Sequence, residues 1–271
     1  MPKKATTTKA KAAPKPAAKT ASKAIKKDPP KSAKSAPATK AKVAATKKAA
    51  PAAKGSKTKY LDLGLLLDIT SSMWSWVTRA KDTLSAIIDN VKASSDGLTV
   101  RVCFVGYRDH CDSVRFDIMD FTENIDAMKA FIQKVKADGG GDAPEDVTGG
   151  MRKVLDQSWS AVSVKQVFHI FDAPCHGSRY HDFSDNHPKG CPEGLILEDL
   201  LKEFKSKSIG FTAIKLTDSC NKMCDAFKKA YPELTVTDMD KAAAGKSAAE
   251  VNKIFAESAS FCAASNITSS D

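Results

Sequence analysis

The chain has 271 residues and a formal net charge of +10, and this charge is unevenly distributed. Residues 1–59 contain eighteen lysines, no arginine and a single acid, Asp28, so this segment carries +17 and residues 60–271 carry −7. The composition therefore predicts one mildly acidic domain behind a basic tail, and it excludes a folded surface that is basic throughout. No run of about eighteen apolar residues is present, so we expect no membrane span.

The start of the chain and its cysteines favour an intracellular protein. The sequence MPKKATTTKAK lacks the apolar core of a secretory signal and the arginines of a mitochondrial presequence. Seven cysteines is an odd number, so at least one is unpaired unless it bonds another chain. We expect free thiols and a location in the nucleus or the cytoplasm.

The basic tail, residues 1–58, repeats Lys, Ala, Pro, Thr and Ser. It cannot bury enough apolar surface to offset the entropy lost on ordering, so we predict that it is disordered. Residues 47–54, KKAAPAAK, resemble the tails of linker histones, and lysines on a flexible chain bind phosphate backbones through counterion release. We predict nonspecific binding of nucleic acid or another polyanion; a solubilising arm, a nuclear-import signal, an anionic membrane and an acidic protein are alternatives. The predicted polyanion contacts are Lys3, Lys4, Lys26, Lys27, Lys47 and Lys48.

After the tail, the chain reads as strands alternating with amphipathic helices. A leucine-rich run over 61–68 predicts a strand buried on both faces. Apolar residues at three- and four-residue steps predict a helix over 74–91, with Trp74 in the core and Trp76 partly exposed. By the same reasoning we expect strands at 99–107 (half-buried), 114–119 (antiparallel edge), 164–171, 209–216 and 234–237, and helices at 124–135, 147–158, 195–205, 221–231 and 248–264.

This order predicts an α/β domain over residues 59–265, followed by a short tail, 266–271. The fold should be doubly wound, with a mostly parallel sheet, one antiparallel edge strand and helices on both faces. In such folds, ligands collect beyond the carboxyl ends of the strands.

Two predicted strands end in residues that suit a hard metal ion. Asp68, Thr70 and Ser72 follow the strand over 61–68, and Asp172 follows the strand over 164–171. Carboxylates and hydroxyls form an all-oxygen donor set of the kind that Mg²⁺ prefers. The alternative is that Asp68 is a turn residue and that Thr70 or Ser72 caps the next helix.

The motif Asp68-x-Thr70-x-Ser72 resembles the Asp-x-Ser/Thr-x-Ser signature of von Willebrand factor A domains, which bind a divalent cation at a metal-ion-dependent adhesion site. In that family a loop residue, usually threonine, and an aspartate after the fourth strand complete the site; Asp142 and Asp172 stand at those positions here. The stretches GGGDAPED and FDAPCHGSRYHDF resemble the A-type domain found beside the catalytic domain in the alpha-kinase group. The resemblance extends over about residues 60–261.

The resemblance implies a Rossmann-like fold and a noncatalytic binding module that holds Mg²⁺. Its predicted ligands are Asp68, Thr70, Ser72, Asp142 and Asp172. Because Asp142 adds a carboxylate where threonine is usual, Ca²⁺ and Mn²⁺ are alternatives. A protein partner would supply an acidic side chain to the metal.

Three other functions stay open at this point: a chromatin or nucleic-acid protein in which the tail does most of the binding, an accessory partner of a separate alpha-kinase, and a metal-assisted hydrolase. We find no nucleotide-binding loop of the Gly-x-x-x-x-Gly-Lys-Ser/Thr type.

A group of cysteines and histidines after the strand over 164–171 has two interpretations. Cys175, His176, His181, His187 and Cys191 lie within seventeen residues and are potential zinc ligands, but their spacing matches no standard zinc module. A loop stiffened by hydrogen bonds is therefore the reading we prefer.

Two more acidic positions lie near the predicted sheet edge. Asp109 is either a supporting group for the metal site or a turn residue, and we expect the turn residue. The glycines at 139–141 let Asp142 turn inward, while Glu145 or Asp146 should lie at the start of the helix over 147–158.

Overall fold

The computed structural model describes residues 59–79, 98–239, 250 and 253. The predicted tail over 1–58 and the segment 266–271 lie outside the described residues, so their predicted properties stay predictions. Most of the helix expected over 74–91 also lies outside them. Of the helix expected over 248–264, only residues 250 and 253 are described, and both are helical.

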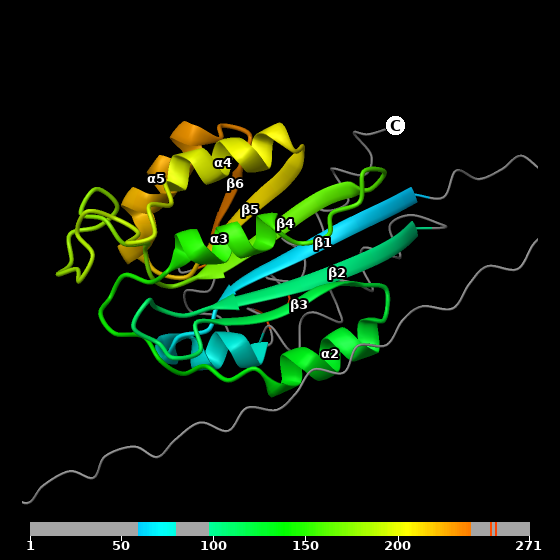
Figure 1. Ribbon diagram of the computed structural model, residues 1–271, viewed down its shortest axis with the longest axis horizontal. Coiled ribbons are helices and arrows are strands. Elements are labelled where there is room, and N and C mark those ends of the chain that lie inside the picture. Colours follow the sequence, from blue (N-terminus) through cyan, green and yellow to red (C-terminus); the bar gives the residue numbers. More distant parts are fainter. Residues whose placement is uncertain (1–58, 80–97, 240–249, 251–252, 254–271) are drawn as a thin grey trace, which may run out of the picture. The chain divides into compact units, whose positions relative to one another are not determined.

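One sheet forms the centre of the described domain, with the strand order β3-β2-β1-β4-β5-β6 (Figure 1). Its strands are β1 (Lys59–Asp68), β2 (Leu98–Tyr107), β3 (Phe116–Thr122), β4 (Val164–Phe171), β5 (Ile209–Lys215) and β6 (Thr235–Asp238). All neighbouring strands in this sheet pair in parallel except β3, which runs antiparallel to β2 at the edge. The predicted fold class, a doubly wound and mostly parallel sheet with one antiparallel edge strand, is confirmed.

Helices cover both faces of the sheet (Figure 1). On one face lie α2 (Ile125–Lys134) and the helical residues 74–79, and on the other lie α3 (Val147–Leu155), α4 (Leu197–Ser206) and α5 (Asn221–Ala230). Short 3₁₀ turns at Ser71–Met73 and Asp218–Cys220 follow the ends of β1 and β5.

Strand β1 shows how the leucine-rich run builds two cores. Side chains alternate between the faces of a strand. Leu61, Leu63, Leu65 and Leu67 therefore pack with α2, whereas Leu66 packs with α3, α4 and α5. Because β1 lies between β2 and β4, its carboxyl end opens at the middle of the sheet edge. This position is where a ligand site was expected.

Strand β2 is more buried than predicted. The alternating pattern suggested a half-buried strand, but all residues from Val102 to Tyr107 are buried. The reason is that β2 lies between β1 and β3 and also contacts α2 and α3. Polar residues at the two ends of β2 made it look more exposed in the sequence than it is.

Trp74 is 67% exposed, so its predicted place in the core is wrong. Met73 and Val77, four residues apart, form the buried face of this segment. Trp74 lies one position further along, about 100° round the helix, and therefore points away from that face. Trp76 is partly buried against the core, as predicted.

The helix predicted over 147–158 ends earlier, at Leu155. The indole N–H of Trp159 donates to the Val154 carbonyl at 2.9 Å, which occupies an acceptor that a further helical turn would use.

The predicted edge strand is shifted as well: β3 begins at Phe116 rather than at Val114. The preceding loop is closed by a hydrogen bond from Arg108 N–H to the Arg115 carbonyl at 2.9 Å.

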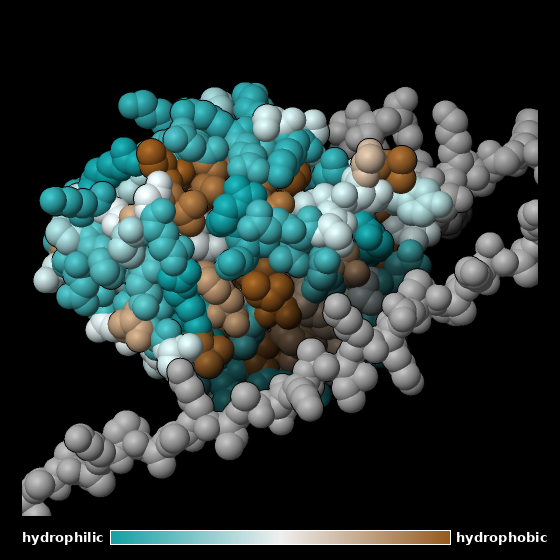
Figure 2. All heavy atoms as spheres, in the orientation of Figure 1, coloured by the Kyte–Doolittle hydropathy of each residue, from teal (hydrophilic) through white to brown (hydrophobic). Residues whose placement is uncertain are grey.

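Within the described part of the chain, no helix is both long and apolar enough to cross a bilayer. Figure 2 shows that hydrophilic side chains cover most of the visible face, with apolar atoms gathered in a few separate patches. Scattered apolar side chains of this kind are normal on protein surfaces and do not by themselves mark a docking site.

Candidate metal centre

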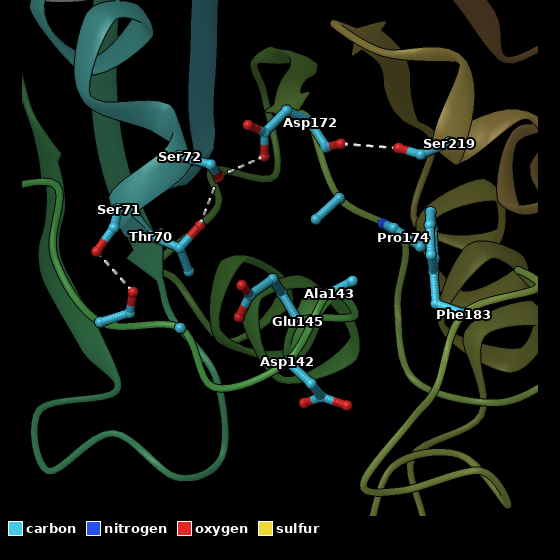
Figure 3. A pocket seen from close by; sticks show the side chains of 13 residues that line it. Thr70, Ser71, Ser72, Asp142, Ala143, Glu145, Asp172, Pro174, Phe183 and Ser219 are labelled. Carbon is cyan, nitrogen blue, oxygen red and sulfur yellow. Dashed lines mark hydrogen bonds between the residues drawn. The ribbon is translucent and has the colours of Figure 1, made fainter.

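The end of β1 delivers a carboxylate and two hydroxyls to the edge of the sheet. Asp68 is fully buried, and its Oδ1 accepts hydrogen bonds from Thr70 N–H at 2.9 Å and from Thr70 Oγ1 at 2.7 Å. Thr70 Oγ1 lies 3.4 Å from Ser72 Oγ, which donates to Asp172 Oδ1 at 3.1 Å (Figure 3). Four of the five predicted ligand residues thus form one chain of contacts that joins β1 to β4.

Neighbouring segments hold this rim in place. Ser71 Oγ donates to the Gly139 carbonyl at 2.8 Å, which ties the turn after β1 to the glycine loop (Figure 3). The Asp172 carbonyl accepts hydrogen bonds from Thr217 Oγ1 at 2.6 Å and from Ser219 Oγ at 3.0 Å, both from the segment after β5. The ends of three parallel strands and one loop therefore meet at a single pocket of about 320 Å³.

Glu145, and not Asp142, turns its carboxylate toward Thr70 (Figure 3). Glu145 is 4% exposed, and its backbone N–H donates to the Pro174 carbonyl at 2.9 Å. Asp142 lines the same pocket from its rim, where its Oδ2 accepts the Asn186 N–H at 2.7 Å. Asp146 caps α3 by accepting the Gly149 N–H at 2.8 Å. Of the two acids expected at the helix start, only Asp146 takes that role.

The close approach of the Glu145 carboxylate to Thr70 requires a glycine in the loop. Gly140 has a φ of +88°, a backbone angle that residues with side chains rarely adopt. A Cβ at this position would lie 2.9 Å from Glu145 Oε1 and 3.4 Å from Thr70 Cβ. Gly140 therefore leaves room for the buried carboxylate.

Three carboxylate oxygens at the pocket are buried without a hydrogen-bond partner: Asp68 Oδ2, Asp142 Oδ1 and Glu145 Oε2. Burial, followed by the charge of Asp172, raises the pKa of Asp68 to about 7. Burial, followed by the charges of Asp68 and three further aspartates, raises the pKa of Glu145 to about 10. Burial also raises the pKa of Asp172. Glu145 therefore retains its proton at neutral pH, and Asp68 retains part of its own.

The donor set fits a hard divalent cation. Asp68, Asp142 and Glu145 each offer an unpartnered oxygen, and Thr70 and Ser72 add hydroxyl oxygens. Mg²⁺, Mn²⁺ and Ca²⁺ all bind such oxygen ligands. None of the described residues that line the pocket is Lys, Arg or His, so the pocket does not suit an anion.

Asp109 begins a turn, as expected, since its carbonyl accepts the Asp112 N–H at 3.1 Å, but its side chain has a further role. It is buried, and its Oδ1 accepts hydrogen bonds from His110 N–H at 2.6 Å and from His176 Nε2 at 2.7 Å. Although burial raises the pKa of Asp109, these bonds lower it to about 2. His176 also contacts Asp185 through Nδ1 at 2.7 Å, and both carboxylates raise its pKa against the effect of burial. Asp109 therefore anchors the loop over 173–196.

The five residues considered for zinc do not meet at one point. Cys175 is buried in the core, and His176 and His181 both contact Asp185, which supports the reading of a loop stiffened by hydrogen bonds. Among the described residues, two groups of three His, Cys, Asp or Glu side chains have ligand atoms within 4.8 Å of one another. They are His110, Asp146 and Cys191, and Asp109, Asp142 and His176.

Sequence reasoning missed Glu145 and the grouping of His110 with Cys191. Glu145 lies among three acids in a loop that has no periodicity, so nothing in the sequence said which carboxylate turns inward. His110 and Cys191 are eighty-one positions apart, and no motif links them.

A family model described as a von Willebrand factor A domain matches residues 62–183. An alpha-protein kinase of Dictyostelium discoideum, vwkA, is 33% identical over 178 residues, which is 65% of this chain and 28% of the kinase. A putative ariadne-like RING finger protein, R811, of Acanthamoeba polyphaga mimivirus is 29% identical over 96 residues, which is 35% of this chain and 10% of that protein. The chain thus spans well under a third of the length of either relative.

Among solved structures, the pilus adhesin SpaC of Lactobacillus rhamnosus GG superimposes with a TM-score of 0.51 and 14% sequence identity. The match covers 76% of this chain and 31% of the adhesin. At this identity the likeness concerns the fold alone.

Proposed function

We propose that residues 62–183, which match the family model of a von Willebrand factor A domain, form a noncatalytic protein-binding module that holds one divalent cation at the carboxyl edge of its sheet. The observation that carries this proposal is the pair of buried, unpartnered oxygens, Asp68 Oδ2 and Glu145 Oε2, beside the hydroxyls of Thr70 and Ser72. Leaving such groups unpaired is costly, and a bound cation would remove that cost.

The proposed ligands, directly or through water, are Asp68, Thr70, Ser72, Glu145 and Asp172. Asp142, which the family resemblance placed among them, lies at the rim and lines the pocket without facing Thr70 (Figure 3). Mg²⁺ is the cation we propose, with Mn²⁺ and Ca²⁺ as alternatives. The ion would supply positive charge to an acidic pocket, and an acidic side chain of a protein partner would complete its coordination.

We propose no catalytic step for this pocket. The described residues that line it include no histidine, cysteine or lysine, the side chains that most often serve as base or nucleophile. The relative from Dictyostelium is named as an alpha-protein kinase, so an accessory role beside such a kinase is a second form of the same binding proposal.

Cation-dependent capture of a partner tests this function. Full-length protein immobilised on beads should retain partner proteins in Mg²⁺ and lose at least nine-tenths of them in EDTA. Ser72→Ala should behave in Mg²⁺ as the wild type does in EDTA, because it removes the hydroxyl that bridges Thr70 and Asp172. Ser71→Ala is the matched control, since its hydroxyl bonds the Gly139 carbonyl instead. Equal capture with and without chelator would contradict the proposal.

A second proposed activity is polyanion binding by the lysine-rich tail. Its support is the charge of +17 carried by residues 1–59, against −7 for the rest of the chain. Such binding should weaken steeply with salt and show no sequence preference. It would suit a chromatin-associated protein, in which the domain recruits further proteins.

Replacing the six predicted tail contacts by glutamine tests this activity. With random-sequence duplex DNA, the variant should bind more weakly than the wild type, and the plot of log affinity against log salt should lose about five units of slope from six lost contacts. Lys→Gln changes at six domain lysines would serve as the control. An unchanged slope in the tail variant would show that the tail does not hold the phosphates. The six changes are at Lys3, Lys4, Lys26, Lys27, Lys47 and Lys48.

A further inference from the structure

A second cluster of metal-binding side chains lies outside the oxygen pocket. His110 follows β2, Asp146 caps α3, and Cys191 belongs to the loop between β4 and α4. One ligand atom from each lies within 4.8 Å of the other two. We propose that His110, Asp146 and Cys191 form a site for Zn²⁺, separate from the cation site at the end of β1.

Two atoms of this cluster are buried without a hydrogen-bond partner. They are His110 Nε2 and Asp146 Oδ2, on side chains that are 6% and 0% exposed, and each has only a longer contact: His110 Nε2 lies 3.3 Å from Asp146 Oδ1, and Asp146 Oδ2 lies 3.3 Å from Arg115 Nε. Asp146 uses its other oxygen, Oδ1, to cap α3 through Gly149, so capping does not satisfy Oδ2. Buried polar atoms of this kind call for an explanation, and a cation bound between them would pair both.

The donor types select zinc over magnesium. A thiolate, an imidazole nitrogen and a carboxylate oxygen are the ligands that Zn²⁺ uses in proteins, whereas Mg²⁺ prefers oxygen alone. Burial, followed by the charge of Arg115, lowers the pKa of His110 to about 4, so its ring is neutral at pH 7 as a metal ligand must be. The two proposed sites therefore differ in donor chemistry as well as in place.

The three ligand atoms are slightly farther apart than in a tetrahedral zinc site, so the side chains must move a little closer together. With zinc bonds of about 2.0 to 2.3 Å, tetrahedral ligand atoms lie roughly 3.3 to 3.8 Å apart. The three atoms here are up to 4.8 Å apart, so they must approach by about 1 Å. Cys191 is only partly buried and free of a disulfide, and a rotation about its side-chain bonds supplies such a movement.

Arg115 borders the cluster and must shift when zinc binds. Its Nη1 lies 2.9 Å from His110 Nδ1, and because a guanidinium only donates, the ring proton of neutral His110 sits on Nε2. Zinc at Nε2 moves that proton to Nδ1, so Arg115 releases His110 and keeps Glu193, which it contacts at 2.7 Å. The Cys191 thiol loses its proton to the buffer. Zinc binding thus releases one proton from Cys191, together with any proton that Asp146 carries.

His187 is positioned to complete the site. Its ring centroid lies 5.3 Å from that of His110, and rotation of the side chain would bring a nitrogen to the metal as the fourth ligand. With zinc bound, the loop that carries Cys191 would be fixed to the end of β2. The same loop supplies His176 to Asp109, so zinc would reinforce a connection that hydrogen bonds already make.

Cobalt substitution tests the proposal on the full-length protein. Metal-free wild-type protein should bind one Co²⁺ with a thiolate-to-cobalt charge-transfer band and release of at least one proton, and Zn²⁺ should then displace the cobalt without further proton release. Cys191→Ser should abolish the band and weaken Zn²⁺ binding at least 100-fold. Cys111→Ser is the matched control, since Cys111 is an exposed free thiol outside the cluster, and it should keep the band.

Asp68→Asn should also keep the band, which separates this site from the proposed magnesium site. A fold check by circular dichroism accompanies each variant. The absence of a thiolate band in wild-type protein, its survival in Cys191→Ser, or its loss in Cys111→Ser would each overturn the proposal. Because the magnesium site contains no thiol, its failure would leave these results unchanged.

Discussion

Asp68→Asn should abolish divalent-cation binding and, at the same time, stabilise the cation-free domain. Asparagine keeps the shape of aspartate and an oxygen for the hydrogen bonds from Thr70, but it removes the negative charge that would hold the ion. In the absence of a cation that same charge is buried, and Asp172 lies near it, which is why the pKa of Asp68 is raised to about 7. The substitution should therefore weaken cation binding and, without a cation, raise the stability of the domain.

We expect Mg²⁺ affinity to fall at least 100-fold, measured by calorimetric titration of the full-length protein. In EDTA at pH 8, the free energy of unfolding should rise by about 1 kcal/mol, because a neutral amide costs less to bury than a charge, although its own N–H groups stay without a partner. Asp225→Asn, on the exposed face of α5, is the control and should change neither quantity. Retained Mg²⁺ binding in Asp68→Asn would remove Asp68 from the site, and a loss of stability in EDTA would show that its charge is already balanced.

Raising the pH from 6.5 to 8 should destabilise the cation-free domain. The carboxyls of Asp68, Glu145 and Asp146 have pKa values raised by burial to about 7, about 10 and about 7. In the unfolded chain these groups ionise near pH 4, so above that pH the folded state binds more protons than the unfolded state. Stability is then fully present below about pH 4 and is lost as the pH rises through the folded-state values.

Glu145 makes the largest contribution to this loss. One proton retained only by the folded state is worth about 1.4 kcal/mol per pH unit, which gives about 2 kcal/mol for Glu145 between pH 6.5 and 8. The buried His110 and His169 have lowered pKa values of about 4 and about 3 and oppose this trend only below pH 6.5, where the unfolded histidines become charged. Above pH 6.5 the acids therefore dominate.

Urea unfolding in EDTA at several pH values checks this expectation. Glu145→Gln should reduce the slope of the unfolding free energy against pH by the equivalent of about one proton. Glu123→Gln, at an exposed glutamate, should leave this slope unchanged. In wild-type protein Mg²⁺ affinity should rise up to tenfold per pH unit, because the ion displaces the Glu145 proton. Stability that is constant or increases from pH 6.5 to 8 would mean that Glu145 is already ionised in the cation-free pocket.

The fold followed from the sequence because its signals are local and repeated. The leucine run of β1, bounded by Asp62 and Asp68, marked a strand covered on both faces, and the same alternation of strands and helices recurred along the chain. Asp68 and Asp172 were expected together for a topological reason, since each ends a parallel strand and such ends share one edge. Ser72 does join them, by its hydrogen bond to Asp172.

The remaining parts of the site depend on loop geometry that composition does not encode. The inward turn of Glu145 was not foreseen because three glycines precede the acids at 142, 145 and 146, and a glycine-rich loop has no fixed side-chain direction. Asp109 does begin a turn, as expected, but its contact with His176 was not foreseen because His176 lies sixty-seven positions away. Trp74 was misplaced by one helical position, since Met73 rather than Trp74 begins the buried stripe.

Anomalous diffraction from crystals grown with Mn²⁺ would test the central claim most directly. The account predicts a strong manganese peak within bonding distance of the oxygens of Asp68, Ser72 and Glu145, and no such peak in crystals of Asp68→Asn. Thr70 and Asp172 should contact the ion directly or through water. A peak at Asp109, Asp142 and His176 instead, or an ordered wild-type pocket that stays without manganese at saturating concentration, would contradict it.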